Sequence, residues 1–484
     1  MKTGIILSYF LICAAIGVWA SRRTRTAADF YVAGKRLGVW TLALAAMAST
    51  LSGFVFIGGP GLVYSLGMGA AFIVLPSAVT SAMGAWVLAK RMRLIGDLRG
   101  AITVPDAIGA RYRSPAAQGL SAIAILIATI GYAATNVLAL GLVVAALSGW
   151  SLGVSIWIGA AVVFAYSVSG GILAGIYIDV FQGLLMAVAS TLVFAVALQT
   201  GGGLVGLSQT IQSLEPGFLS PWGTGTVIGA LSFYFVFSVG TLAQPHVVHK
   251  YYMLRDAQRL KWYPLLMGVA MLVTLLLYLG VGLAMKAAVL RGDQPALTSP
   301  DAATPTFLLA YTTPALAGLV FAGVAAAIMS TVNAFLNVGA AALTHDLPRA
   351  FGWPAGDALR RGRWATVVIA VLAAAVAQFS GQLVAFLGIF GFGLFASTLV
   401  PSLAVGLNWP GGTRAGALAS ISTGLVVTLG AETAAYLRWL SLPKGFSIAG
   451  AALALSLLVY IVVSVLTRRT AGDVDPDIRA LLDV

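Results

Sequence analysis

The chain has 484 residues, of which 60% are hydrophobic and only 9% are charged, whereas roughly a quarter of the residues in a soluble domain are charged. Its net charge of +13 would suggest a nucleic-acid partner in a soluble protein, but here the basic residues stand in short segments between apolar stretches. Composition and charge together exclude a soluble globular fold, give no support to nucleic-acid binding and predict an all-α integral membrane protein.

Apolar stretches of about 20 residues, the length that crosses the hydrocarbon core, recur along the chain. The basic cluster Arg22–Arg25 follows the first stretch instead of preceding it. This order predicts a retained helix and not a signal peptide. We expect about 13 transmembrane helices, at approximately 3–20, 38–66, 68–89, 117–147, 151–170, 175–199, 225–246, 261–285, 305–340, 364–378, 381–407, 414–430 and 446–466.

No segment between these spans is long enough for a separate domain, so residues 1–484 are expected to form a single transmembrane transporter domain with a short cytoplasmic tail at 467–484. The single cysteine, Cys13, excludes a disulfide framework and a cluster of soft metal ligands. The sequence carries no P-loop, nucleophile elbow or zinc-binding helix motif, so we do not expect an enzyme, and energy must come from a gradient.

The distribution of basic residues predicts the orientation of the chain. With the N-terminus outside, the cytoplasmic segments carry 23 of the 28 Lys and Arg residues, and the opposite orientation leaves only five inside. The positive-inside rule therefore favours an outside N-terminus and a cytoplasmic C-terminus in the inner (plasma) membrane. In this topology Lys250, His246, His249 and His345 fall in cytoplasmic loops, where we interpret the histidines as structural or solvated.

The second apolar stretch, MASTLSGFVFIGGPGLVYSLG, contains hydroxyl residues followed by the cluster Gly58–Gly61. Glycine and proline weaken the helical hydrogen-bond ladder, and backbone freed at membrane depth is tolerated only beside protein or a water-filled cavity. We expect a broken helix here. The alternative is a loop tip or a close helix contact through small residues.

Asp179, in GIYIDVFQGLL at the start of the sixth span, is the one carboxylate that we place well inside an apolar stretch. Gln182 lies on the same helical face. An acid inside the membrane is costly and is therefore a functional-site hypothesis, whereas the alternative is that Asp179 caps its helix near the cytoplasmic end.

The seventh stretch, FYFVFSVGTLAQPHVV, carries Ser238, Gly240 and Thr241 in mid-segment and Pro245 close behind. This is a second place where the helix is expected to break. Interrupted helices at corresponding positions of two halves point to a transporter binding site. The two breaks thus predict repeats of five helices each, at about 38–199 and 225–407.

The ninth stretch brings hydroxyl and amide groups into a helix built of Ala, Val, Gly and Leu. Ser330, Thr331, Asn333 and Asn337 supply oxygen atoms that suit a hard monovalent cation. Ser and Thr in membrane helices also bond to their own i−4 carbonyl or to a neighbouring helix, which is the alternative here.

Four of these segments together resemble the signature segments of the sodium:solute symporter family, in which sodium/proline-type symporters are found. They are SGFVFIGGPGLVYSLG, SGGILAGIYIDVFQG, AQPHVVHKYY and AAAIMSTVNAFLNVGAAALTHDL, accompanied by TVPDAIGARYRS. The resemblance implies a LeuT-type fold of 5+5 inverted repeats with one extra N-terminal and two C-terminal helices. It also implies alternating access driven by the sodium ion (Na+).

The resemblance further implies a sodium site made of carbonyls from the first broken helix and of a carbonyl and two hydroxyls from the ninth span. In this sequence those residues are Ala48, Leu51, Ala327, Ser330 and Thr331. Some family members bind a second sodium ion through the acid matched by Asp179 and two hydroxyls. Here these two positions are Asn333 and Ala334, so Asp179 and Asn333 remain candidates for a second ion or for coupling.

Residues beside the two breaks are the expected solute pocket. They form a small surface of apolar and hydroxyl groups that suits an amino acid such as proline or a short organic acid: Thr50, Ser52, Phe54, Tyr132, Phe237 and Thr241. Proline-type members resemble this chain less closely here, since they carry an acid at the position of Thr50 and larger aromatics at those of Phe237 and Thr241. Sugar-type members carry amides around the break, and Val55 does not match them.

The sequence thus predicts a sodium-coupled symporter of a small organic solute, whose partners are the solute, sodium and the lipid bilayer, with no obligatory protein partner evident. Two alternatives stay open at this point. Asp179 could serve a proton-coupled carrier, and a transporter-like domain could act as a membrane sensor, although the tail after Thr467 is short for a signalling domain.

Overall fold

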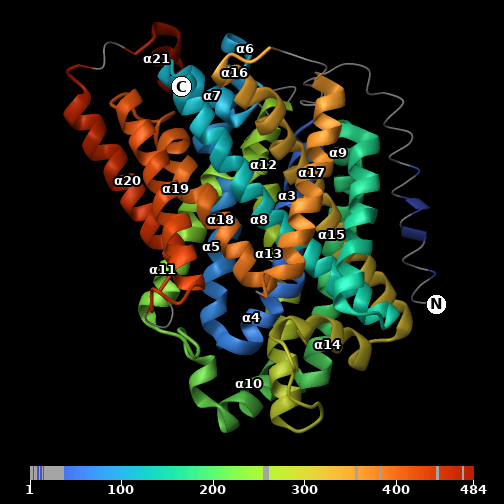
Figure 1. Ribbon diagram of the computed structural model, residues 1–484. Coiled ribbons are helices and arrows are strands. Elements are labelled where there is room, and N and C mark those ends of the chain that lie inside the picture. Colours follow the sequence, from blue (N-terminus) through green and yellow to red (C-terminus); the bar gives the residue numbers. More distant parts are fainter. Residues whose placement is uncertain are drawn as a thin grey trace.

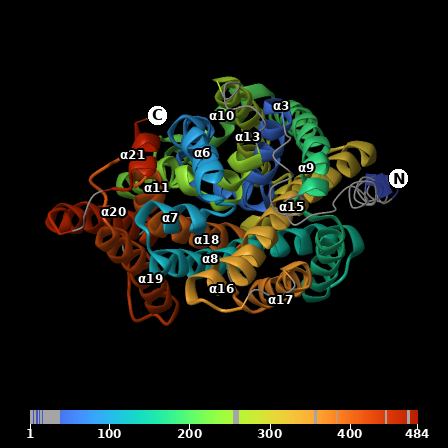
Figure 2. The same ribbon diagram turned by 90° about the horizontal axis from the view of Figure 1, so that it is seen from above.

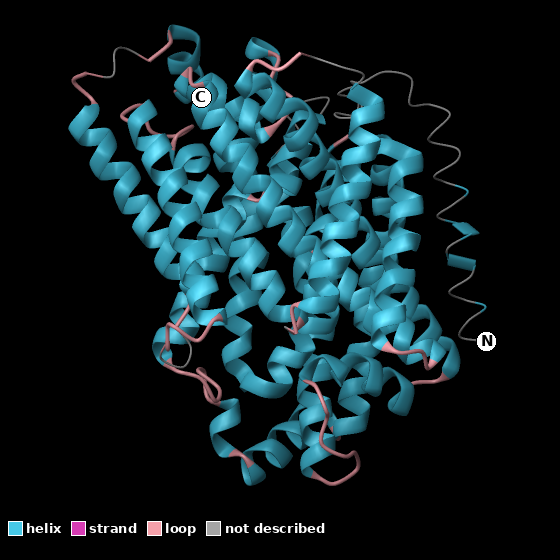
Figure 3. Cartoon of the chain, in the orientation of Figure 1, coloured by secondary structure: helices cyan, strands magenta, loops and turns pink. Residues whose placement is uncertain are grey.

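The computed structural model describes residues 4, 8, 9, 11, 12, 15, 38–253, 261–354, 358–381, 383–442, 446–470 and 474–483. These residues form helices joined by short loops, and they contain no strand (Figure 3). Ten of the described helical segments are long and apolar enough to cross a membrane, and two further apolar helical segments, Val39–Thr50 and Leu152–Phe164, are shorter. The expected number of 13 spans is not confirmed, and the first of them, at 3–20, lies mostly outside the described residues.

The long helices are α8 (Pro115–Ser148), α9 (Leu152–Gly201), α13 (Tyr263–Leu290), α15 (Pro314–Ala341), α17 (Ala358–Phe379), α18 (Val384–Leu399), α19 (Arg414–Tyr436) and α20 (Ile448–Thr467). Shorter helices are α3 (Val39–Thr50), α4 (Gly59–Leu66), α5 (Ala71–Gly84), α6 (Lys90–Arg99), α7 (Val104–Tyr112), α10 (Gly203–Leu214), α11 (Val227–Gly240), α12 (Pro245–Val248), α14 (Ala303–Tyr311), α16 (Leu347–Phe351) and α21 (Pro476–Leu482). Single turns of 3-10 or π-helix are η2 (Phe54–Gly58), η3 (Gly67–Ala70), η4 (Ala85–Ala89), η5 (Pro216–Leu219), η6 (Thr241–Ala243), η7 (His249–Met253), η9 (Pro300–Ala302), η10 (Ala342–Asp346) and η11 (Val400–Val405).

Three helices form the interior of the bundle. The apolar windows of α15 and of the α18–η11 segment are 83% and 89% buried, and that of α8 is 78% buried, against 33% for α19. Helix α15 packs on α3, α8 and α9, while α18 packs on α8, α19 and α20. Figure 1 accordingly shows α8 and α18 near the centre, α19 and α20 on one flank and α9 and α17 on the other. Lipid-facing helices thus surround a protein-packed interior, which is where irregular backbone can be accommodated.

Short helices cover both ends of the bundle. One end carries α6, α7, α16 and α21 and is called the basic face below, and the other carries α10 and α14 (Figure 1). Figure 2 looks onto the basic face, with α19, α20 and α21 on one side and α17 on the other.

The helix break expected in the second stretch is present, but it lies at Leu51–Gly53 and not at the glycine cluster. Leu51 is extended (φ −83°, ψ 103°) and ends α3. The amide N–H of Gly53 donates to Asn136 Oδ1 at 2.8 Å, so a side chain of α8 satisfies backbone that the break has freed.

The cluster Gly58–Gly61 is helical and serves close packing, which was the alternative interpretation. A Cβ atom added to Gly59 would lie 2.1 Å from the Tyr278 ring, and one added to Gly61 would lie 2.7 Å from the carbonyl oxygen of Pro300. Pro60 stands in the first turn of α4, where it is tolerated. The glycines therefore let neighbouring segments approach the broken helix.

Candidate functional site

The second break lies in the seventh stretch, as predicted. Helix α11 ends at Gly240, the turn η6 follows, and Gln244 is extended (ψ 113°) before α12 begins at Pro245. Nε2 of Gln244 donates to the Gly240 carbonyl at 3.0 Å, which satisfies an acceptor that the broken helix leaves unpaired. Proline lacks an amide hydrogen and fits the first turn of α12 for the same reason as Pro60 fits α4.

Residues from the two breaks line one small cavity of about 40 Å³. Five of the six residues expected in the solute pocket line it: Thr50, Phe54, Tyr132, Phe237 and Thr241. The sixth, Ser52, lies just behind, with its hydroxyl 3.4 Å from that of Tyr132. This volume holds at most a few water molecules.

Aromatic and hydroxyl side chains both contribute to the cavity wall. The ring of Phe237 stacks on Phe54 with centroids 5.9 Å apart and on Phe392 with centroids 4.4 Å apart. The hydroxyl of Thr241 is 2.9 Å from that of Thr80 on α5. Such a wall offers apolar contact on one side and hydroxyl hydrogen bonds on the other.

Two polar residues of the wall, Gln244 and His246, were not predicted as solute residues. The ring of His246 is 4.3 Å from that of Phe335 and is buried, which contradicts its expected place in a cytoplasmic loop. Both residues belong to the AQPH segment that follows the second break, so extending the predicted pocket along this segment would have found them.

Three of the five residues expected to bind sodium, Leu51, Ala327 and Thr331, meet where α15 passes the first break. The hydroxyl of Thr331 lies 3.1 Å from the Ser49 carbonyl oxygen, 3.3 Å from that of Leu51 and 2.9 Å from that of Ala327. Four oxygen atoms from two helices thus converge at this point. Ala48 lies in the last turn of α3 and is fully buried.

Ser330, the other predicted hydroxyl ligand, belongs to an adjacent polar cluster. Its hydroxyl donates to Asp179 Oδ1 and is 3.4 Å from the hydroxyl of Ser49. The hydroxyl of Ser49 in turn donates to Asp179 Oδ2 at 3.3 Å. Asp179 is 3% exposed, so it points into the protein interior, and a role limited to capping its own helix does not account for these contacts.

The cation that faces Asp179 is Lys250, whose ammonium lies 3.0 Å from Oδ2 and also donates to Ser49 and to the Ala45 carbonyl. Lys250 is 3% exposed, so its predicted place in a cytoplasmic loop is wrong. The structure continues the membrane segment to Met253, seven residues beyond the predicted end, and it buries His249 as well. The apolar and aromatic residues after Lys250 were the available signal for a longer segment.

Asp179 and Asn333 share a cavity of only about 10 Å³ with Lys250. Nδ2 of Asn337 donates to Asn333 Oδ1 at 3.4 Å. The structure therefore brings together the two candidates for a second ion site, but it places an ammonium group between the helices at the same position.

A second buried charged cluster lies under the basic face, around Asp106 of the TVPDAIGARYRS segment. Its carboxylate is 2.9 Å from His345 Nε2 and 3.3 Å from Arg349, and it accepts from the Ile102 amide and from Gln118. Burial acts to raise the pKa of Asp106, but the hydrogen bond and charge of His345, the Ile102 amide and the charge of Arg349 lower the pKa below its usual value.

Ligand atoms of Asp106, His345 and Asp346 lie within 4.8 Å of one another, a spacing that a metal ion could bridge. Both oxygens of Asp106 already accept hydrogen bonds, and an arginine stands beside them. We therefore interpret this cluster as a tie between α7, α8 and the end of the ninth span.

Comparison with known proteins adds an independent observation. The family model of the sodium:solute symporter family matches residues 30–424. The osmoregulated proline transporter OpuE of Bacillus subtilis is 28% identical over 97% of this chain and 96% of its own length. A sodium/proline symporter of Staphylococcus aureus is 27% identical over 99% of this chain and 95% of its own.

Solved structures with the same fold include a Na+-coupled sialic acid symporter in a substrate-bound outward-open state, with a TM-score of 0.78, 18% identity and 98% coverage of both chains. MhsT in complex with L-phenylalanine matches with a TM-score of 0.53 and 14% identity, over 87% of this chain and 98% of its own. At these identities the likeness concerns the fold alone. It confirms the predicted all-helical LeuT-type architecture.

Proposed function

The chain belongs to the sodium:solute symporter family, and from this premise we propose that it carries proline, or a small amino acid or short organic acid of similar size, together with sodium by alternating access. Family membership makes it a multi-pass plasma-membrane transporter that uses Na+ as coupling ion, and not an enzyme. The identity of the solute, the residues that bind it and the direction of the termini are what the proposal adds.

One observation carries the proposal: the hydroxyl of Thr331 stands among carbonyl oxygens of α3 and α15, next to the cavity at the two breaks. Hard cations prefer such neutral and anionic oxygen atoms. We propose that sodium binds there through Ala48, Leu51, Ala327, Ser330 and Thr331, the five residues that the family resemblance implies. Sodium would replace hydrogen bonds that now join α3 to α15.

Binding at this point would couple ion to solute because both sites share the first break. Thr50 lines the solute cavity, and Leu51, the next residue, offers its carbonyl to the ion site. An ion that orders this backbone raises affinity for solute, and the solute raises affinity for the ion by the same factor. One charge that crosses the membrane contributes about 2.3 kcal/mol per 100 mV, so a single sodium supports considerable accumulation.

The cavity wall favours a small zwitterion with an apolar body. None of the described residues that line the cavity is Arg or Lys, so a carboxylate would meet hydroxyl, amide and imidazole groups instead of a full positive charge. Phe54, Phe237 and Phe392 would contact an apolar ring. The relatives named as proline transporters also favour proline as the solute. The departures from the proline-type pattern at Thr50 and Thr241 mean that other small amino acids are candidates too.

We further propose that Lys250, and not a second sodium, is the cation that balances Asp179. Its ammonium lies 3.0 Å from the carboxylate of Asp179 on α9 and donates to two groups of α3. Lys250 therefore links η7 to α9 and to α3 beside the first ion site. An ion at Asn333 would face this ammonium at short range. The stoichiometry is then one sodium per solute.

The orientation and the repeats remain proposals with specific support. The basic face carries the clustered Lys and Arg residues of α6, α7, α16 and the tail, so we place it, and the C-terminus, in the cytoplasm. The breaks at Leu51 and Gln244 support two repeats at residues 38–199 and 225–407, because each break lies near the start of its half.

Solute-stimulated uptake of radioactive sodium into proteoliposomes tests the proposal. Proline, other small amino acids and monocarboxylates are compared in the wild-type protein and in the Ser330→Ala and Thr331→Ala variants. We expect proline-dependent sodium entry and a roughly tenfold loss of apparent sodium affinity in each variant, equivalent to about 1.4 kcal/mol.

The matched controls are Ser456→Ala and Thr366→Ala. Both hydroxyls are buried in membrane helices, and within the described part of the chain each bonds only to a carbonyl of its own helix. They should transport like the wild type. Solute entry that ignores sodium but follows a pH gradient would establish proton coupling instead and would shift attention to Asp179. Ligand binding without any solute flux would favour the sensor.

A further inference from the structure

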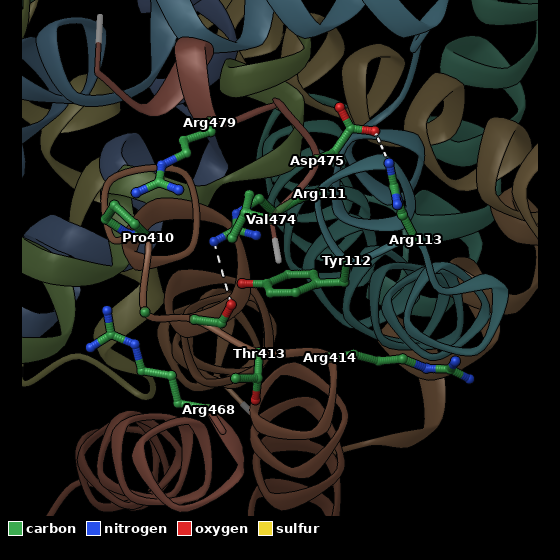
Figure 4. A pocket seen from close by; sticks show the side chains of 12 residues that line it. Arg111, Tyr112, Arg113, Pro410, Thr413, Arg414, Arg468, Val474, Asp475 and Arg479 are labelled. Atoms are coloured by element: carbon green, nitrogen blue, oxygen red, sulfur yellow. Dashed lines mark hydrogen bonds and ion pairs between the residues drawn. The ribbon is translucent and has the colours of Figure 1, made fainter. Parts of the chain in front are cut away.

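A cavity of about 560 Å³ opens on the basic face (Figure 4), and it shares no lining residue with the cavity at the two breaks. It lies between the end of α7, the loop that leads into α19, the end of α20 and the C-terminal segment that carries α21. Among the described residues its ionisable side chains are five arginines, one tyrosine and one acid, and we call it the arginine cavity: Arg111, Arg113, Arg414, Arg468 and Arg479, with Tyr112 and Asp475.

Asp475, the one acid among the described lining residues, already has partners. Asp475 pairs with Arg113 and, outside the cavity, with Arg99 at 2.7 Å. The guanidinium of Arg111 is buried and donates to the carbonyls of Gly406 and Trp409 at 2.8 and 3.1 Å. Arg111 and Arg113 are thus held by contacts within the protein and form part of the cavity wall.

The charges of the other three arginines are not neutralised by acids of the described residues. Within the described residues, the guanidinium groups of Arg414, Arg468 and Arg479 form no ion pair and no hydrogen bond, and all three side chains are exposed. In Figure 4 the side chains of Arg468 and Arg479 lie on the same side of the cavity, around Pro410, whereas the side chain of Arg414 points away on the opposite side. Like charges gathered without a counter-ion repel one another, so an anion placed among them is favoured.

The backbone adds positive potential at the same place. Helix α19, 23 residues long, begins at the cavity with Thr413 as its N-cap, and the loop before it contains Gly411 and Gly412. A helix N-terminus carries about half a positive charge and offers free N–H groups. The planar fork of arginine matches the oxygens of a phosphate group.

The position of the cavity relative to the bilayer indicates which molecules could supply the anion. Arg414 is the first residue of α19 and Arg468 directly follows α20, and both helices are long and apolar enough to cross the membrane. The cavity therefore stands at the level where crossing helices leave the hydrocarbon, which is where lipid headgroups lie. We propose that the arginine cavity is a binding site for a phosphate group, supplied by an anionic phospholipid or by a soluble phosphate ester.

The site would also hold the tail. Arg479 belongs to α21, whereas Arg468 ends the last membrane helix, so a phosphate between them joins two segments. The tail is otherwise attached to α6 by Arg99, which pairs with Asp475 and Asp477, and by Arg91, which donates to the Leu482 carbonyl. Ligand binding is thus expected to reduce the mobility of residues 474–483.

Native mass spectrometry of the full-length protein in detergent tests the proposal in two arms. In the lipid arm the protein is titrated with phosphatidylglycerol and with phosphatidylcholine, and in the soluble arm with inorganic pyrophosphate. The variants are Arg468→Gln/Arg479→Gln and, as a matched control, Arg363→Gln, an exposed arginine of α17 on the other side of the same face.

We expect phosphatidylglycerol to bind at least tenfold more tightly than phosphatidylcholine, with the preference lost in the double variant and kept in the control. Pyrophosphate binding that the double variant loses, without a lipid preference, also supports the phosphate site and assigns it to a soluble ester. No binding in either arm, or equal binding by all three proteins, overturns the proposal. Sodium-dependent uptake by the double variant verifies that it is folded, and uptake is expected to persist because neither arginine contacts the ion or solute residues.

Discussion

Positive charge has opposite surroundings in two regions of the molecule: the buried pair of Asp179 and Lys250, and the arginine cavity. Lys250 is 3% exposed and has an acid and two further oxygen atoms within hydrogen-bond distance. Arg414, Arg468 and Arg479 are exposed, and the described residues offer them no partner. The protein supplies the partners of Lys250, whereas the three arginines are available to a ligand.

The difference follows from the cost of removing a charge from water. A buried ion that loses its partner costs several kcal/mol, so an interior cation persists only where the fold supplies its ligands. An exposed arginine keeps its water shell, so the fold can leave it unpaired at little cost. The interior pair is therefore expected to support structure and transport, and the cavity to support binding.

Replacing Lys250 tests the interior half of this comparison and should have the largest effect. Lys250→Met leaves Asp179 buried without its cation, and we expect a loss of about 3–5 kcal/mol in stability and a loss of sodium-dependent uptake. The double variant Lys250→Met/Asp179→Asn should recover most of the stability, because it removes both charges. Thermal unfolding in detergent and proteoliposome uptake measure the two effects, and a single variant as stable as the wild type would contradict the proposed role.

Asp301 offers an intermediate case, because it is a buried carboxylate for which the described residues provide no basic partner. Burial raises its pKa to about 6, even though the Val384 amide at the start of α18 donates to it at 2.9 Å and opposes the rise. The folded chain thus holds this proton more tightly than the unfolded chain does. Its contribution to stability is full below about pH 4, and it is lost as the pH rises through about 6.

The Asp301→Asn variant isolates this contribution. Its amide oxygen can still accept from Val384, but it does not titrate. Between about pH 4 and 7 the wild type should lose up to about 3 kcal/mol relative to the variant. Parallel unfolding curves at several pH values check the difference, and curves that keep a constant separation would show that Asp301 does not titrate in this range.

Lys286 and Glu215 form a partly exposed counterpart of the interior pair, with 2.6 Å between charged atoms and side chains 17% and 36% exposed. Lys286→Met should cost no more than about 1 kcal/mol, since water solvates the remaining acid. Measured beside Lys250→Met by the same unfolding assay, it separates the effect of burial from that of losing a lysine. Equal losses in the two variants would break the comparison.

The smallest effect is expected for Asp475→Asn at the rim of the arginine cavity. Arg113, through a hydrogen bond and its charge, and the Asp477 amide lower the pKa of Asp475, so this acid is ionised at neutral pH. Its loss should leave global stability and uptake unchanged and should increase protease cleavage of the tail. It should also tighten binding of phosphatidylglycerol, because the one acid that competes for Arg113 has gone.

By itself the sequence determined the membrane class, the family, both interrupted helices and the two hydroxyls of α15, because each of these features follows from local composition or from a contiguous motif. It also indicated five residues that line the cavity, since they lie beside the breaks. Only the tertiary structure decided the break at Leu51, the burial of Lys250 beside Asp179 and the convergence of arginines from α7, α19, α20 and α21. The physical reason is that the sequence at the end of a membrane segment is similar whether that end is exposed to water or packed against other helices. Partners 71 residues apart along the chain, such as Asp179 and Lys250, are set by helix packing and not by any local pattern.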